Sequence, residues 1–202
     1  MKSAILLDMY GVILKESKGN FLPYTFTHFP VEEHDRLTRL FRDEQLFTRA
    51  GYGEMSSDEF LTVLGYENPG ETMRDYIENY LTLDEGFIPF AEKYHEKYDL
   101  VLLSNDVSEW SKHITNLYGL DKYFKAEIVS GDVKFRKPQQ RIYEIALEQI
   151  SRRAEECLFV DNAVKNLNIA EELGISPILF NRDNELYSGK TVNSFEELAC
   201  LL

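Results

Sequence analysis

The chain has 202 residues, a length that suits one ordinary domain with room for an insertion, and 44% of them are hydrophobic. A nucleic-acid backbone or an anionic membrane surface would repel its net charge of −13, so neither is an expected partner. No apolar run approaches the roughly 20 residues that a membrane helix needs. The two cysteines, Cys157 and Cys200, predict no disulfide framework and no zinc site, and we expect a reduced, cytoplasmic protein.

Short apolar runs that end abruptly at a polar residue predict strands buried on both faces of a parallel sheet. The first run covers residues 4–7 and ends at Asp8. Three further runs and one weaker candidate follow along the chain: 100–103 before Ser104, the weaker 126–129, 158–160 before Asp161, and 177–180 before Asn181.

Amphipathic stretches at 87–97, 107–118, 138–150 and 163–173 predict helices between these strands. Asp106 is the expected N-cap of the second helix, and Gly174 is the expected C-cap of the last one. Strands that alternate with helices predict the α/β class, as a Rossmann-like, doubly wound parallel sheet. Ligands of such sheets bind beyond the carboxyl ends of the strands, where Asp8, Ser104 and Asp161 stand.

Residues 17–84 interrupt this alternation, because they hold no strong strand. Helical patterns occur there at 31–41, 57–64 and 72–81, and Ser56 or Ser57 can cap the middle one with help from Glu59. We therefore predict a helical cap at 17–84, inserted into a core formed by 1–16 and 85–202. Its many aromatic residues are expected to form the cap's own core, with a minority facing a pocket. Since the insertion follows Asp8 closely, we expect a mobile lid.

Four polar groups are expected to meet at the carboxyl edge of the sheet: Asp8, Ser104, Lys137 and Asp161. Each residue alone is more often an ordinary turn or surface residue, so their order and placement carry the functional hypothesis. Asp8 can attack phosphorus or carbon and form a covalent intermediate, and Gly11 lets the chain turn sharply behind it. Ser104 can bind an oxyanion, Lys137 can neutralise it, and Asp161 can complete an oxygen-only metal site with Asp8.

At these positions the sequence resembles the haloacid dehalogenase superfamily of hydrolases, over nearly its whole length. The segments that carry the resemblance are 8–12 (Asp-Met-Tyr-Gly-Val), 103–105 (Leu-Ser-Asn), 136–138 (Arg-Lys-Pro) and 159–162 (Phe-Val-Asp-Asn). The resemblance implies a Rossmann-like core with a helical cap inserted after the first motif. It also implies that Asp8 is the nucleophile and that Ser104 and Lys137 are catalytic.

The resemblance further implies a small anionic substrate and a Mg²⁺ ion. The implied substrate contacts are Tyr10, Gly11, Asn105 and Tyr143. The implied metal ligands are Asp8, the backbone carbonyl of Tyr10, Asp161 and Asn162. Asn162 stands where the paired-acid form of the motif has a second Asp, so we expect weak affinity for Mg²⁺.

Tyr10 leaves the reaction open between three alternatives. Phosphatases of the superfamily usually carry a second Asp at this position, and a phenol is a poor general base near neutral pH. Metal-independent 2-haloacid dehalogenases carry Tyr there, but they avoid a carboxylate where Asp161 stands and have an acid where this chain has Asn166. We therefore place a Mg²⁺-dependent phosphatase first and a dehalogenase second. A phosphate-binding regulatory protein with little turnover comes third.

Overall fold

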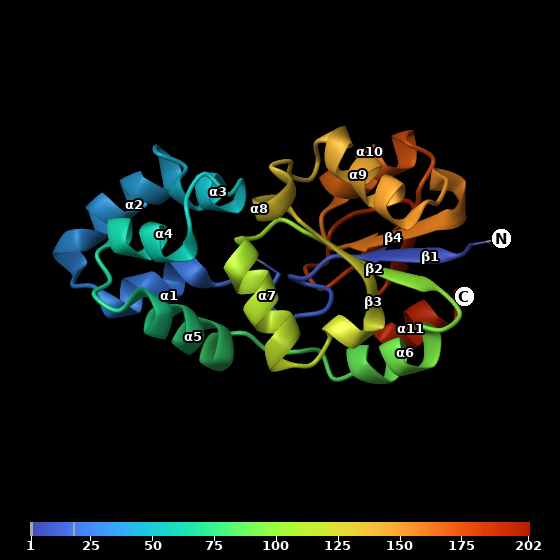
Figure 1. Cartoon of the computed structure of the whole chain (residues 1–202), viewed down its shortest axis with the longest axis horizontal. Helices are drawn as coiled ribbons and strands as arrows, with labels where there is room; N and C mark the ends of the chain where they lie inside the picture. Colours follow the sequence, from blue (N-terminus) through green and yellow to red (C-terminus); the bar gives the residue numbers. More distant parts are fainter. Residues whose placement is uncertain (1, 18) are drawn as a thin grey trace.

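The computed structural model describes residues 2–17 and 19–202, so Met1 and Lys18, which fall within the predicted core and cap, lie outside the described residues. Six parallel strands form one sheet in the order β3-β2-β1-β4-β5-β6 (Figure 1). The strands are β1 (Ala4–Leu7), β2 (Asp99–Ser104), β3 (Phe124–Val129), β4 (Cys157–Asp161), β5 (Ser176–Phe180) and β6 (Lys190–Val192). The strand order reverses between β1 and β4, as in a doubly wound sheet, and this is where its ligands bind.

Consecutive strand residues point to opposite faces of the sheet, and both faces are buried. Leu7 and Leu102 belong to one hydrophobic cluster, together with the helices α6 (Phe87–Tyr94), α7 (Ser108–Leu117) and α11 (Phe195–Ala199). Leu6 and Val101 belong to a second cluster with α9 (Gln140–Ile150) and α10 (Val164–Glu172). The sheet is therefore covered by helices on both faces, which explains the continuous apolar runs of its strands.

Of the six α-helices described between β1 and β2, the first five gather at the carboxyl end of the sheet, opposite the end where both chain termini lie (Figure 1). They are α1 (Phe21–His28), α2 (His34–Arg42), α3 (Leu46–Gly51), α4 (Ser57–Leu64) and α5 (Pro69–Tyr80). They stand where the sequence predicts a cap, and the boundaries at residues 17 and 84 stay a prediction. The remaining short elements are α8 (Ser130–Val133) and the 3-10 helices Val31–Glu33, Asp121–Tyr123 and Ala154–Glu156.

Two chain segments join these helices to the sheet, and they run side by side. The N–H of Lys15 donates to the carbonyl of Thr82 at 2.9 Å, and the N–H of Asp84 donates to the carbonyl of Ile13 at 2.9 Å. The guanidinium of Arg182, beyond β5, binds the Asp84 carboxylate at 2.5 Å. It also donates to the carbonyls of Gly11 at 3.0 Å and Val12 at 3.2 Å, so one side chain fastens both segments.

The helical layer is also bound to α7. Trp110 of α7 lies among the aromatic rings of the cap, with its ring centroid 4.8 Å from that of Phe21. Its indole Nε1 donates to the hydroxyl of Ser57 at 2.7 Å, and the N–H of Ser57 donates to Glu109 at 3.0 Å. The expected mobile lid would have to break these contacts.

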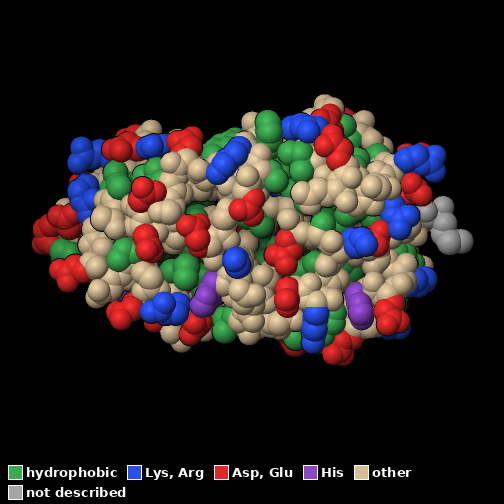
Figure 2. Space-filling view, in the orientation of Figure 1, with side chains coloured by type: hydrophobic (Ala, Val, Ile, Leu, Met, Phe, Trp, Pro, Cys, Tyr) green, Lys and Arg blue, Asp and Glu red, His purple; other side chains and the backbone are tan. Residues whose placement is uncertain are grey.

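Acidic and basic side chains are interspersed over the face shown in Figure 2. Within the described part of the chain, no helix combines the length and the hydrophobicity that crossing a membrane requires.

Candidate active site

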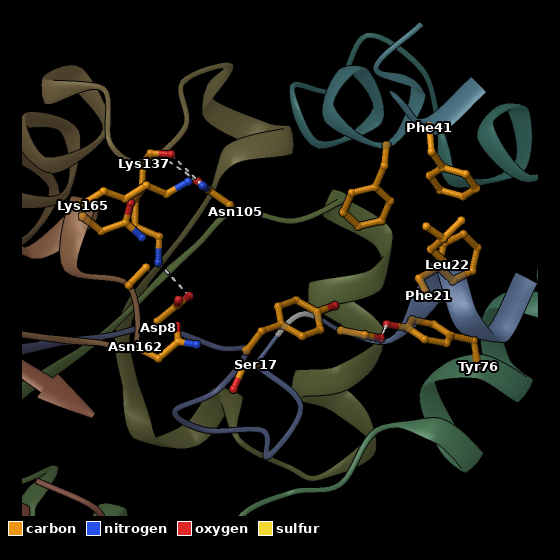
Figure 3. Close-up of a pocket in the computed structure, with 15 residues that line it drawn as sticks. Asp8, Ser17, Phe21, Leu22, Phe41, Tyr76, Asn105, Lys137, Asn162 and Lys165 are labelled. Atoms are coloured by element: carbon orange, nitrogen blue, oxygen red, sulfur yellow. Dashed lines mark hydrogen bonds and ion pairs between the residues drawn. The ribbon is translucent and has the colours of Figure 1, made fainter. Parts of the chain in front are cut away.

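The ammonium group of Lys137 lies between two carboxylates, as predicted for the carboxyl edge of the sheet. Its Nζ is 2.7 Å from Oδ1 of Asp8 (Figure 3) and 2.8 Å from Oδ2 of Asp161. Parallel pairing of β1 with β4 brings the two acids together, because Leu7 lies opposite Val160. All three side chains are almost wholly buried. The structure thus joins three of the predicted residues in one ionic cluster.

Two negative charges facing one positive charge leave this cluster short of positive charge. Burial raises the pKa of Asp8 to about 7, Lys137 opposes that rise, and Asp161 adds to it. Burial by itself would lower the pKa of Lys137, but the two acids outweigh it and raise that pKa above its usual range. Lys137 therefore stays charged, and a further cation would favour the ionised form of Asp8.

Both carboxylate oxygens of Asp161 accept hydrogen bonds from the protein. Besides Lys137, it accepts hydrogen bonds from the N–H of Ala163 at 2.7 Å and from Nδ2 of Asn166 at 3.0 and 3.1 Å. Tyr143 is part of the same arrangement, because its buried hydroxyl donates to the carbonyl of Asn166 at 3.0 Å. Tyr143 does not line the site's cavity, and its observed contact is the one with Asn166, so its predicted contact with substrate stays a prediction.

Asn105 holds the backbone of Lys137 in place. Its Nδ2 donates to the Lys137 carbonyl at 2.8 Å, and its Oδ1 accepts from the Lys137 N–H at 2.7 Å. The neighbouring Ser104 ends β2 and is fully buried, and its Oγ has no hydrogen-bond partner among the described residues. Asn105 thus faces the cavity while its amide is already engaged. The predicted binding of an oxyanion by the buried Ser104 hydroxyl stays a prediction, since Ser104 does not line the cavity.

Tyr10 reaches past the nucleophile toward a buried acid that sequence analysis treated only as a helix cap. Its hydroxyl donates to Oδ2 of Asp106 at 3.2 Å, and Ser111 donates to the same oxygen at 2.8 Å. The predicted capping is wrong in detail, because the N-cap position of α7 is Val107, and the Val107 N–H is the backbone group of the described residues that donates to the Asp106 carboxylate. Burial, followed by the charge of Asp106, raises the pKa of Tyr10 well above its usual range.

Gly11 and Asn162 form the turn behind Asp8. Gly11 has a φ of +81°, and a Cβ atom at that position would lie 2.4 Å from Nδ2 of Asn162. A side chain at position 11 would therefore displace Asn162, so the structure places Gly11 as a close-packed turn residue. Asn162 lies beside Asp8 at the wall of the cavity (Figure 3).

Three oxygen atoms near this turn are candidate ligands for a hard divalent cation. Oδ2 of Asp8 has no hydrogen bond to a described residue, since Oδ1 takes both Lys137 and the N–H of Met9. The carbonyl of Tyr10 and the side-chain oxygen of Asn162 are the other two candidates. Both oxygens of Asp161, the other predicted ligand, already accept hydrogen bonds from the protein. Asp161 as a metal ligand and the weak affinity for Mg²⁺ stay predictions.

A cavity of about 320 Å³ opens between the sheet edge and the cap. Its core side is polar and includes Lys165, whose exposed ammonium is directed toward Asn105 (Figure 3). Its cap side is formed by the side chains of Ser17, Phe21, Leu22, Phe41, Phe47 and Tyr76, together with Gly19. The sequence predicted that some cap aromatics face a pocket but did not indicate which ones. Lys165 was not predicted, and its place one turn after Asp161 is the one signal for it.

Comparison with known proteins identifies the family of this chain. A model of the haloacid dehalogenase-like hydrolases matches residues 2–174, so the chain belongs to that family. A 90-residue stretch, 45% of this chain, is 30% identical to drimenol cyclase of Aspergillus calidoustus, and it spans 15% of that longer protein.

Several solved structures share the fold. A haloacid dehalogenase-family phosphatase from Thermococcus onnurineus has a TM-score of 0.77 and 22% identity, over 100% of this chain and 97% of that one. A family enzyme of Bacteroides thetaiotaomicron, crystallised with magnesium and inorganic phosphate, has a TM-score of 0.76 and 20% identity, over 93% and 98%. A dehalogenase has a TM-score of 0.69 and 22% identity, over 100% and 97%.

Proposed function

We propose that this chain, as a haloacid dehalogenase-like hydrolase, is a Mg²⁺-dependent phosphatase that hydrolyses a small phosphate monoester through a covalent intermediate on Asp8. The observation that carries the proposal is the buried cluster in which Lys137 alone faces both Asp8 and Asp161. A divalent cation would balance the excess negative charge, and oxygen ligands for it lie beside Asp8. The magnesium and phosphate in the Bacteroides enzyme support the same chemistry. The cytoplasmic location stays a prediction.

In the first step, a carboxylate oxygen of Asp8 attacks phosphorus while the ester P–O bond breaks and its electron pair leaves with the alcohol oxygen. Lys137 binds Oδ1 of Asp8 and so orients the carboxylate toward the substrate. Ser104 can donate its hydroxyl hydrogen to a phosphoryl oxygen. When bound, Mg²⁺ would supply a second positive charge to the phosphoryl group.

In the second step, water attacks the phosphorus of the acyl phosphate and its proton passes to solvent. The bond between phosphorus and Asp8 breaks, and the electron pair returns to the carboxylate. No side chain suited to this proton transfer stands at position 10, since the Tyr10 hydroxyl donates to Asp106. General acid–base help is typically worth about 10²- to 10⁴-fold, so we expect slow turnover and a preference for good leaving groups.

Dehalogenation is the second candidate, and two observations favour it. A halide leaves without a proton, so the reaction needs no acid at Tyr10, and the cap side of the cavity is apolar. The buried carboxylate of Asp161 argues against a metal-independent dehalogenase. In a site without a metal, Asp8 alone would neutralise Lys137, and Asp161 would add an uncompensated negative charge.

One assay separates the candidates: turnover of p-nitrophenyl phosphate and of 2-chloropropionate, each with and without Mg²⁺. We expect phosphate release that requires Mg²⁺ and disappears in Asp8→Asn but not in Asp183→Asn, which alters an exposed carboxylate. Chloride release without Mg²⁺ would establish the dehalogenase instead. Phosphate binding with neither activity would favour the regulatory protein.

A further inference from the structure

The cavity between cap and core has two walls of different chemistry. The core wall presents Asp8, Lys137, Asn162 and Lys165, which are charged or polar (Figure 3). The cap wall carries no charged side chain among the described residues that line it. A molecule that fills the cavity therefore meets the ionic cluster at one end and carbon surface at the other.

The polar atoms of the aromatic cap wall are already used inside the protein. The hydroxyl of Tyr76 donates to the carbonyl of Gly19, and the hydroxyl of Tyr10, where the two walls meet, donates to Asp106. Among the described lining residues, this leaves Ser17 as the hydroxyl on the cap wall without a hydrogen bond. A polyhydroxylated ligand would lose water there without gaining enough partners, which is unfavourable for each hydroxyl so buried.

The apolar surface on this wall is only partly covered by the protein itself. Phe21 and Tyr76 are buried at the base of the wall, whereas Leu22 is 37% exposed and both Phe41 and Phe47 are partly exposed. Covering carbon surface of this kind with an apolar ligand is favourable. The cavity volume of about 320 Å³ is at the small end for ligand sites, so the ligand is small.

From these two walls we infer that the substrate joins its phosphate to an apolar group, aromatic or branched aliphatic, and not to a sugar or nucleotide. The phosphate lies at Asp8 and Lys137, and the apolar group packs against Leu22, Phe41 and Phe47. This inference rests on the proposed phosphatase function for the phosphate end alone.

Calorimetry with two non-hydrolysable probes tests the apolar end. Benzylphosphonate and 2-hydroxyethylphosphonate share the anionic group and differ in the attached group. We expect benzylphosphonate to bind at least about tenfold more tightly, which is the low end of what an apolar pocket achieves for one added group. Leu22→Asn, which keeps the shape and adds polarity, should reduce that ratio severalfold. The matched control is Val63→Asn, on the exposed face of α4 and away from the cavity.

Equal affinity for the two probes, or a ratio that Leu22→Asn leaves unchanged, would overturn the inference, as would failure of both probes to bind. Because Leu22 is partly exposed, the Leu22→Asn variant should fold, and Phe41→Leu gives a second change on the same wall.

Turnover of benzyl phosphate and glycerol phosphate separates the apolar-substrate inference from the proposed phosphatase function. Equal rates would overturn the inference but keep the phosphatase. A benzylphosphonate preference without any phosphate release would keep the apolar pocket and reject the phosphatase.

Discussion

Lys137 is the residue on which the buried carboxylates of the site depend. Replacing it by Met, which has a similar length and no charge, would leave Asp8 and Asp161 buried without their ammonium partner. Removing one partner of a buried ion pair typically costs about 3–5 kcal/mol, so we expect Lys137→Met to lower the free energy of unfolding by that order and to abolish turnover. Urea unfolding at pH 7.5 measures the first effect. Lys165→Met is the matched control, since that ammonium is exposed, and an equal loss in both variants would contradict the prediction.

Tyr10 offers a direct test of what replaces the usual second acid. Its hydroxyl is engaged with Asp106, so Tyr10→Phe should keep turnover of p-nitrophenyl phosphate near the wild-type level and cost about 1 kcal/mol of stability for the lost hydrogen bond. Tyr10→Asp supplies a carboxylate that can transfer protons, and should raise turnover of alkyl phosphates by as much as about 10²-fold. Loss of activity in Tyr10→Phe would mean that the phenol takes part in the reaction.

Asp106 makes stability depend on pH. Burial raises its pKa from the ordinary value of 3.8 to about 7, so between these values the folded chain holds a proton that the unfolded chain has released. The free energy of unfolding therefore falls as pH rises from about 4 to about 7, by up to about 1.4 kcal/mol per pH unit for this group, and then levels off. In Asp106→Asn that contribution disappears. Urea titrations from pH 4.5 to 8 should give a shallower slope for the variant, and parallel slopes would contradict the prediction.

The sequence predicted the ionic cluster well because strand ends of a parallel sheet meet at one edge. Asp8 and Asp161 follow directly from that rule. The rule does not predict the contacts of Asn105 and Tyr143. The Asn105 side chain binds the backbone of Lys137, 32 residues away, and the Tyr143 hydroxyl binds the backbone of Asn166, 23 residues away, and no local sequence pattern reveals such contacts. Asp106 was identified only as a helix cap, because its burial depends on Tyr10 and Ser111 converging on it.

Among the helices and strands, predictability followed the strength of the apolar pattern. The helix predicted at 57–64 is α4, and its N-terminus has the complete capping box of Ser56 and Glu59. The strand β6 is missing from the prediction because it has three residues, of which Lys190 and Thr191 are exposed. Helix α1 was missed because it carries Pro23, and its N-cap Asn20 has a φ of +51° and no side-chain cap. Neither segment is long enough for its hydrophobic periodicity to be recognised in the sequence.

Two adjacent serines allow the contact between α4 and α7 to be tested separately from helix capping. Ser57→Ala leaves the buried indole N–H of Trp110 without its partner, which costs about 1–3 kcal/mol, whereas Ser56→Ala removes a cap worth about 0.5–2 kcal/mol. Since Trp110 is the only tryptophan, its fluorescence reports this contact directly. We expect a shifted emission maximum and faster hydrogen exchange in the cap helices for Ser57→Ala alone. The same spectral change in both variants would contradict this.

The molecule as a whole carries an excess of 13 negative charges, so any cation will stabilise it to some degree through screening. A specific Mg²⁺ site must be distinguished from that general effect. Among the proposed ligands, Asn162 is the neutral side chain beside Asp8 whose charge a substitution can change. Asp has nearly the same shape as Asn, so Asn162→Asp can occupy the same space against Gly11 and add one charge.

A ligand that binds only the folded state stabilises it by RT ln(1 + [L]/Kd), so tenfold tighter binding adds about 1.4 kcal/mol at high Mg²⁺. We expect Asn162→Asp to show at least that additional stabilisation in thermal unfolding with 10 mM Mg²⁺, an order-of-magnitude choice for a weak site, at constant ionic strength. Asn162→Leu should lose the specific effect. Asn168→Asp is the charge-matched control, because it adds the same charge at an exposed position of α10. If both Asp variants gain equally from Mg²⁺, the cation acts on the net charge and Asn162 is not its ligand.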